Sequence, residues 1–338
     1  MASVLLATVA ILLAVDALVH LVVARVALPV FEEKLPSLPS PVVDVPTAED
    51  VTFDTRDQLR LRGTLFRGAA ARPRGLIVFC PEMDGDSRSA PAYCQGLLDA
   101  GFHVLAFDFR NQGRSDRMPD YDPLHWLTEY EVADTLAVFD WIETRPELRK
   151  LPLGIFGVSR GGSAALATAA RNPRIRCVAA DGAFSLRKMM MHHGLNWARL
   201  YVPQPILRLI PGWHVDLTTL LVGWWSGWQR HCRYITLEHW MPALCRRQVL
   251  LISGSRDAYV VPEITRQLDR QMDGVNTAVW IVPGAKHNSA RTVQPEQYHN
   301  RLVEFFSALD RQQEPDKSKV PVVEEVGTTA RRRIEAPV

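Results

Sequence analysis

Six short apolar runs alternate with helix-favouring stretches through the middle of the chain. They are GLIVFC, HVLAFDF, LPLGIFGV, IRCVAAD, QVLLISG and TAVWIVPG. Runs of this length that are apolar at almost every position are typical of strands buried on both faces. The clearest helical stretch between them covers residues 127–145 and ends before Pro146. The alternation predicts an α/β fold, with a mostly parallel, twisted sheet covered by helices on both faces.

Upstream of these runs, residues 51–68 alternate between apolar and polar positions and contain a turn signal at residues 56–58. This pattern predicts a hairpin at the edge of the same sheet. The sheet and its helices are expected to form one domain over residues 49–311. Residues 186–245 interrupt the alternation between the fourth and fifth of the six runs, and we expect them to form a helical lid insert.

The N-terminus is apolar at almost every position from residue 2 to residue 30. A helix of about 20 such residues spans the hydrocarbon core of a bilayer, so residues 1–30 predict a single-pass membrane anchor. A cleaved signal peptide is disfavoured because the run is long and no charged segment precedes it. Asp16, His20 and Arg25 oppose insertion, although Asp16 and His20 lie one helical turn apart and could pair. An amphipathic helix on a membrane surface or against a partner is the alternative.

The two flanks of the predicted domain differ from it in composition. Residues 31–48 are rich in proline, which predicts a stiff spacer holding the domain off the membrane. Residues 312–338 are polar and charged, which predicts a disordered C-terminal tail. Arg25 and Lys34 favour a cytoplasmic domain by the positive-inside rule, but two basic residues leave the orientation open. The oligomeric state is not indicated by any pattern.

Charge and cysteine content exclude several classes of function. A formal net charge of +2 over 338 residues gives no reason to expect a nucleic-acid partner. Five cysteines without a CxxC pair indicate neither a disulfide framework nor a zinc site. We also predict no metal and no organic cofactor.

Candidate chemistry follows three of the predicted strands. Ser159 lies in the sharp turn between LPLGIFGV and an alanine-rich helix, where Gly157 and Gly161 allow close approach of the backbone. Asp257 follows QVLLISG, and His287 follows TAVWIVPG. Parallel strands bring such positions to one edge of the sheet. A hydroxyl, an imidazole that takes its proton and a carboxylate that orients the imidazole form a nucleophilic triad.

The motifs around these residues resemble those of the α/β-hydrolase superfamily. GVSRG fits the G-x-S-x-G elbow, SGSRDAYVVP resembles the acid loop, PGAKHN the histidine loop, and DFRNQGRSD a further segment with Asn111 where glycine is usual. The resemblance covers roughly residues 50–310, most like the acylglycerol-lipase and serine-aminopeptidase branch. It implies Ser159 as nucleophile, His287 as base and Asp257 as acid. Asp181, after IRCVAAD, is the alternative acid.

One loop departs from the family pattern. The oxyanion loop usually begins with His-Gly, and here it reads Cys80-Pro-Glu-Met-Asp-Gly. Proline has no N–H to donate, so we nominate the backbone amides of Glu82 and Arg160 as the oxyanion donors. The acidic residues Glu82, Asp84 and Asp86 are interpreted as a solvated loop, or alternatively as a site for a positively charged substrate group.

The predicted lid and anchor suggest the kind of substrate. Six of the nine tryptophans lie in residues 186–245, interleaved with arginines, as on surfaces that meet lipid headgroups. The leading hypothesis is a membrane-anchored serine hydrolase that cleaves carboxylic esters or thioesters of lipophilic acyl substrates. The alternatives are a peptidase or amidase of short amine-bearing substrates, and a non-catalytic scaffold that binds a lipid or a protein. Acyl transfer to an alcohol other than water stays open.

Overall fold

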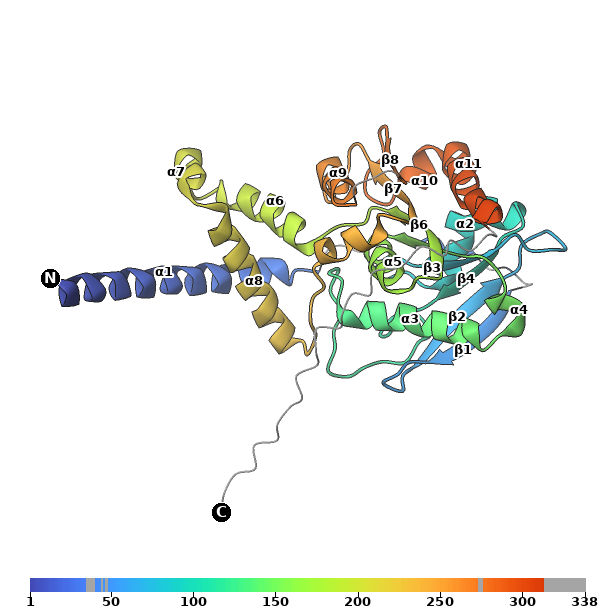
Figure 1. Ribbon diagram of the computed structural model, residues 1–338, viewed down its shortest axis with the longest axis horizontal. Helices are drawn as coiled ribbons and strands as arrows, with labels where there is room; N and C mark the ends of the chain where they lie inside the picture. The colour runs from blue at the N-terminus through green and yellow to red at the C-terminus, as the bar shows by residue number, and fades with distance from the viewer. Residues whose placement is uncertain (35–39, 44, 46–47, 273–275, 313–338) are drawn as a thin grey trace, which may run out of the picture.

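A computed structural model describes residues 1–34, 40–43, 45, 48–272 and 276–312 (Figure 1). Much of the predicted proline-rich spacer, namely residues 35–39, 44, 46 and 47, lies outside the described residues. So does nearly all of the predicted tail, from residue 313 to residue 338.

The described strands form one sheet in the order β1-β2-β4-β3-β5-β6-β7-β8. β1 and β2 form the predicted edge hairpin, β2 is antiparallel to β4, and the other pairs are parallel. The prediction of a mostly parallel sheet is confirmed, and five of the six predicted strands are buried. The prediction of a buried strand is wrong for the sixth, TAVWIVPG, because this strand lies at the edge of the sheet and keeps several side chains partly exposed. The strands are β1 (Glu49–Asp54), β2 (Arg60–Phe66), β3 (Leu76–Cys80), β4 (His103–Phe107), β5 (Leu153–Val158), β6 (Ile175–Asp181), β7 (Gln248–Gly254) and β8 (Thr277–Val282).

Helices cover both faces of the sheet (Figure 1). Side chains alternate along β3, so that Val78 packs on one face and Phe79 on the other. The Val78 face carries α3 (Glu129–Glu143), α5 (Arg160–Arg171) and α9 (Pro262–Arg270); the Phe79 face carries α2 (Ala90–Asp99), α10 (Ala290–Val293) and α11 (Pro295–Phe306).

The helix predicted over residues 127–145 is α3, which begins at a capping box. The Thr128 side chain accepts from the first turn while the Glu131 carboxylate accepts from the Thr128 amide. The helix ends at Glu143, and Pro146 opens the short helix α4 (Pro146–Arg149), where its missing N–H is not needed.

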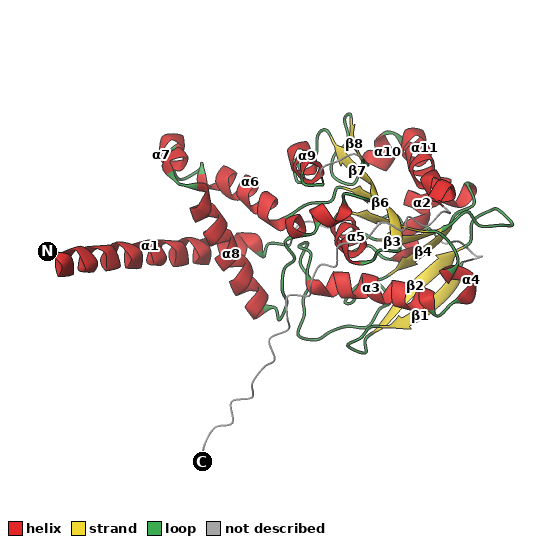
Figure 2. Ribbon diagram, viewed as in Figure 1, coloured by secondary structure: helices red, strands yellow, loops and turns green. Residues whose placement is uncertain are grey.

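The insert between β6 and β7 is helical, as predicted. It consists of α6 (Leu186–Ala198), α7 (Gln204–Leu209) and α8 (Gly212–Gln229), followed by two 3-10 turns, Leu237–His239 and Met241–Leu244. Figure 2 shows these helices projecting from the sheet-bearing body next to the long N-terminal helix. Two further 3-10 turns, Ser87–Ser89 and Ser307–Gln312, belong to the body.

The N-terminal helix α1 (Ala2–Phe31) is long and apolar enough to cross a membrane, with a mean hydropathy of 2.5 in its most apolar window. Its second half packs against α8 and buries a stripe of residues about one turn apart: His20, Ala24, Leu28 and Phe31. The Ser226 hydroxyl and the Arg230 guanidinium donate to the Glu32 carboxylate just beyond it. The helix therefore contacts the lid directly. That residues 31–48 hold the domain off the membrane stays a prediction.

Candidate active site

Ser159 occupies a strained turn between β5 and α5. Its φ of 53° and ψ of −120° lie in a region that costs a non-glycine residue about 1–3 kcal/mol. A Cβ at Gly157 would collide with the Gly161 carbonyl, and one at Gly161 with the carbonyls of Cys80 and Pro81. The sequence-based reason for both glycines is confirmed. The Ser159 amide donates to the Asp181 carbonyl at 2.7 Å, which ties the turn to β6.

Ser159, His287 and Asp257 form one hydrogen-bonded chain. The Ser159 Oγ lies 2.9 Å from His287 Nε2, and His287 Nδ1 lies 2.7 Å from Asp257 Oδ2. The other carboxylate oxygen of Asp257 accepts from the amides of Tyr259 at 2.9 Å and Val260 at 2.8 Å. Because a carboxylate accepts only, His287 carries its proton on Nδ1 and presents the Nε2 lone pair to the serine. The geometry allows Ser159 to transfer its proton to His287 as it attacks.

Asp181, the alternative acid, has a different partner. Its carboxylate accepts from the Tyr298 hydroxyl at 2.9 Å, on the side of β6 that faces α11. Burial raises the pKa of Asp181 to about 6, and the Tyr298 hydrogen bond offsets part of that shift. Among the described residues, Asp257 and not Asp181 is hydrogen-bonded to His287.

The two nominated oxyanion donors come from adjacent segments. Arg160 is the first residue of α5, so its amide has no acceptor within the helix. Gly161 packs directly against the backbone of Cys80 and Pro81, which brings the loop carrying Glu82 beside the turn. The chain thus places both segments where two amides can converge, and the roles of Glu82 and Arg160 remain predictions.

The acidic residues of that loop lie in three different surroundings. Asp86 pairs with Arg88 at 2.6 Å, Asp84 is exposed, and Glu82 is buried with 4% of its surface exposed. The interpretation of all three as solvated is therefore wrong for Glu82. Burial raises the pKa of Glu82, and the Tyr93 hydroxyl lies 3.4 Å from its Oε1.

Residues 108–116, with the sequence DFRNQGRSD, contact the side chain of Arg160 next to the turn. The buried Arg160 guanidinium donates to Gln112 Oε1 at 2.7 Å and to the Leu124 carbonyl at 2.9 Å. Asn111 has a φ of 62°, so the left-handed backbone that we expected asparagine to tolerate is confirmed. The Arg160 guanidinium also pairs with the buried Glu131 carboxylate of α3 at 3.4 Å. The sequence did not assign the Arg160 side chain, because its partners come from α3 and from the loop between β4 and α3.

An aromatic cluster next to the triad was not predicted. The Tyr259 ring lies 5.2 Å from the His287 ring, and Phe184 and His125 pack around Tyr259. The Tyr259 hydroxyl and His125 Nδ1 are buried without a hydrogen-bond partner among the described residues. Burial, with the nearby Arg160 and His193, lowers the pKa of His125 to about 3, so this ring is neutral. The only signal in the sequence was the position of Tyr259 two residues after Asp257.

A cleft of about 1120 Å³ runs along the lid helix α8. Its lining includes Leu220, Trp224 and Trp228 of α8, together with Tyr130 at the start of α3. None of the triad residues lines it, so this cleft is distinct from the site around Ser159.

Comparisons with known proteins agree with the fold. The profile of the alpha/beta hydrolase fold family matches residues 84–205. An esterase of Pyrococcus furiosus superposes with a TM-score of 0.58 over 82% of this chain and 99% of its own, at 21% identity. The chain has the α/β-hydrolase fold.

Two relatives share sequence with this chain over different lengths. A thiohydrolase of Aspergillus aculeatus is 30% identical over 135 residues, which is 39% of this chain and 40% of that protein. An uncharacterized protein of Mycobacterium tuberculosis is 25% identical over 251 residues, 74% of this chain and 76% of its own. The chain thus spans well under half of the thiohydrolase. The elbow and its helix fall within the segment that the family profile matches.

Proposed function

We propose that this α/β-hydrolase is a serine hydrolase that cleaves carboxylic esters or thioesters through an acyl-enzyme on Ser159. The observation that supports it most is the hydrogen-bonded chain from Ser159 through His287 to Asp257. The second oxygen of Asp257 is occupied by two amides, so the carboxylate is fixed and can hold one ring orientation of His287.

In the proposed mechanism, Ser159 Oγ attacks the acyl carbonyl while His287 Nε2 takes its proton. The amides of Arg160 and Glu82 donate to the oxygen that becomes negative. The tetrahedral intermediate collapses as His287 returns the proton to the leaving alcohol or thiol. Water, activated by the same histidine, then hydrolyses the acyl-enzyme and restores Ser159. The strained backbone of Ser159 holds the hydroxyl above the sheet throughout.

Exposed apolar surface supports the proposal of a lipophilic substrate and a membrane location. We define the lid stripe as Trp213, Leu217, Leu220, Trp224 and Trp228, all on α8 and each at least 37% exposed. Leu200, Tyr201 and Leu209, at the far end of the lid, are also exposed. The N-terminal half of α1 exposes apolar side chains on all sides. Such surface in a soluble protein would be unstable, and a bilayer would cover it.

Within this proposal, residues 1–30 anchor the chain and residues 49–311 form the catalytic domain. Because α1 and α8 pack together, an anchored α1 also places the lid at the membrane surface. An ester or thioester dissolved in the membrane would then enter from the lid side. The similarity to a thiohydrolase makes thioesters a suitable second substrate class to test.

A peptidase or amidase is the second candidate, and the buried Glu82 is the observation behind it. A carboxylate near the nominated oxyanion loop could pair with a substrate amine if it is ionised. Burial raises the pKa of Glu82, which favours the neutral acid and weakens this candidate at neutral pH.

The test uses the full chain in nanodiscs. Hydrolysis of p-nitrophenyl esters from short to long acyl chains is compared with that of an acyl thioester and an aminoacyl amide. We expect turnover of esters or thioesters, rising with chain length, and loss of at least about a thousandfold in Ser159→Ala. Ser307→Ala, at the end of α11, is the matched control and should retain activity. Faster turnover of the amide would favour the peptidase, and no turnover by a folded protein would favour a scaffold.

A further inference from the structure

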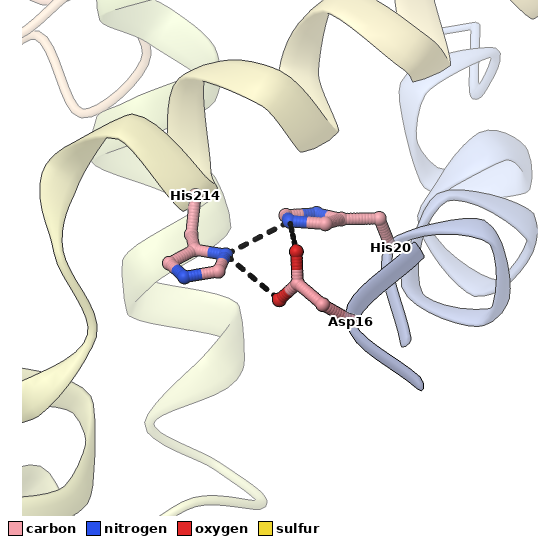
Figure 3. A group of neighbouring side chains, drawn as sticks. All are labelled: Asp16, His20 and His214. Carbon is pink, nitrogen blue, oxygen red and sulfur yellow. Dashed lines mark hydrogen bonds and ion pairs between the residues drawn. The ribbon is translucent and has the colours of Figure 1, made fainter. Parts of the chain in front are cut away.

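Three potential metal ligands from distant parts of the chain converge between α1 and α8. Asp16 and His20 lie one turn apart on α1, and His214 lies near the start of α8. One ligand atom of each lies within 4.8 Å of the others (Figure 3). We propose that this cluster binds a divalent transition-metal ion of the Zn²⁺ type, which joins the N-terminal helix to the lid. This site is separate from the triad and does not depend on the proposed hydrolase activity.

Hydrogen bonds around His20 orient it as a ligand. The Thr218 hydroxyl donates its one proton to the His214 carbonyl at 2.9 Å. It therefore accepts from His20 Nδ1, which lies 2.9 Å away. A neutral His20 with its proton on Nδ1 presents the lone pair of Nε2 to Asp16 and to His214, whose Nδ1 lies at hydrogen-bond distance (Figure 3). A bound ion would replace the proton shared by the two rings, and His214 would then carry its proton on Nε2. A hydrogen bond to the other ring nitrogen that fixes the tautomer in this way is typical of metal-binding histidines.

The three ligand atoms are spaced as a metal ion requires. His20 Nε2 lies 2.8 Å from His214 Nδ1 and 3.7 Å from Asp16 Oδ2, and His214 Nδ1 lies 3.6 Å from Asp16 Oδ1. Ligands at about 2.0–2.1 Å from a tetrahedral Zn²⁺ are about 3.3 Å apart. The observed distances bracket this value, so small side-chain movements suffice. The carboxylate turns one oxygen toward each imidazole, and a water molecule could complete the coordination.

The charge and the burial of the three side chains favour binding of a cation between them. His20 is buried with 5% of its surface exposed, whereas Asp16 and His214 are partly exposed and leave a path for entry. The Trp213 ring stacks on His214 with centroids 3.6 Å apart, giving the site an apolar wall. A carboxylate in a largely apolar helix is costly, and coordination of a cation offsets that cost. Two imidazoles and one carboxylate form a ligand set that suits Zn²⁺.

An ion bound at this site would link α1 to α8. α1 supplies two ligands at i and i+4, and α8 supplies the third, 194 residues away from His20. A bound ion would hold the lid against α1 in one register and would slow its separation. The sequence predicted no metal because only the folded chain brings His214 to the Asp16–His20 pair.

The test is metal binding by the full chain in detergent, purified without a histidine tag and stripped with a chelator. Zn²⁺ is titrated against a chromophoric competitor, and bound metal is measured by mass spectrometry. We expect one Zn²⁺ per chain. His214→Asn and Asp16→Asn should weaken binding by more than about a hundredfold, and Thr218→Val by about tenfold through loss of the hydrogen bond to His20 Nδ1. His192→Gln, in α6, is the control and should bind as the wild type does.

The wild-type titration keeps the proposal testable even if a variant fails to fold. Zn²⁺ should also slow cleavage of the lid by trypsin in the wild type but not in His214→Asn. Absence of stoichiometric Zn²⁺ in the wild type would overturn the proposal. Equal binding by wild type and a folded His214→Asn would overturn it too, because the ion would then be bound elsewhere.

Discussion

The ring of Phe31, the last residue of α1, stacks on the ring of Trp126 with centroids 5.1 Å apart, and the Trp126 Nε1–H donates to the Phe31 carbonyl at 2.9 Å. Trp126 also packs against His125 and Phe184, which surround Tyr259 beside the triad. The N-terminal helix, the lid and the acid loop therefore share one apolar cluster. The end of the helix is part of the structure around the candidate active site.

Trp126→Phe tests the hydrogen bond between Trp126 and the Phe31 carbonyl. It retains a stacking ring but leaves the buried Phe31 carbonyl without its donor, so we expect a loss of stability of about 1–3 kcal/mol. The measurement is denaturant unfolding of the full chain in detergent. Trp224→Phe, on the exposed lid stripe, is the control and should change stability by less than about 0.5 kcal/mol. Equal stability of Trp126→Phe and wild type would show that the hydrogen bond from Trp126 to Phe31 does not stabilise the fold.

The identity of the acid is tested by a matched pair. Asp257→Asn removes the charge that orients His287, and we expect kcat for an ester to fall by about 10⁴-fold. Asp181→Asn, which changes the Tyr298 partner instead, should lower kcat by less than about tenfold. Steady-state kinetics on one p-nitrophenyl ester decides between them. A larger loss in Asp181→Asn would reverse the assignment.

His125 makes stability depend on pH. Its pKa is about 3 in the folded protein, below the ordinary value of about 6.5, so between these values the unfolded chain binds a proton that the folded chain does not. Stability is therefore lost as pH falls below about 6.5. At pH 5 this loss of folding stability, relative to neutral pH, is about 2 kcal/mol.

This dependence is checked by unfolding at pH 7.5 and pH 5. His125→Gln should lose about 2 kcal/mol less than the wild type between the two conditions. His239→Gln, in the lid insert, serves as the control and should follow the wild type. If His125→Gln keeps the wild-type difference, His125 is not buried as described.

The lid stripe is tested through the physical state of the substrate. Replacing Trp224 and Trp228 with glutamine removes two exposed rings, which are 71% and 69% exposed. We expect hydrolysis of a long-chain ester in vesicles to fall at least about tenfold, since tenfold corresponds to only about 1.4 kcal/mol. Hydrolysis of the water-soluble p-nitrophenyl acetate should not change. An equal loss on both substrates would place the two residues in the catalytic site instead of at the membrane.

The sheet and its strand ends could be predicted from the sequence because their signals are local. A run such as LPLGIFGV is apolar at almost every position, and Gly157 and Gly161 indicate a sharp turn at Ser159. Ordered positions after strands then place Asp257 and His287 at the same edge. Each of these inferences needs only a short stretch of chain and the geometry of a parallel sheet.

Contacts between distant segments could not be predicted in this way. No periodicity links Phe31 to Trp126, or His20 to His214, because each pair meets only when α1 packs on the lid. The burial of Glu82 is equally hidden, since a loop rich in acidic residues reads as solvated until its neighbours are known. The contact between the lid and α1, the contact between Phe31 and Trp126 and the candidate metal site all depend on tertiary packing.

The most direct test of the proposed hydrolase is covalent labelling of the full chain in nanodiscs by a fluorophosphonate, followed by peptide mass spectrometry. The proposed mechanism requires the label on Ser159, its loss in Ser159→Ala, and much slower labelling in His287→Gln. A folded wild-type protein that does not react, or that carries the label on another residue, would contradict an activated Ser159.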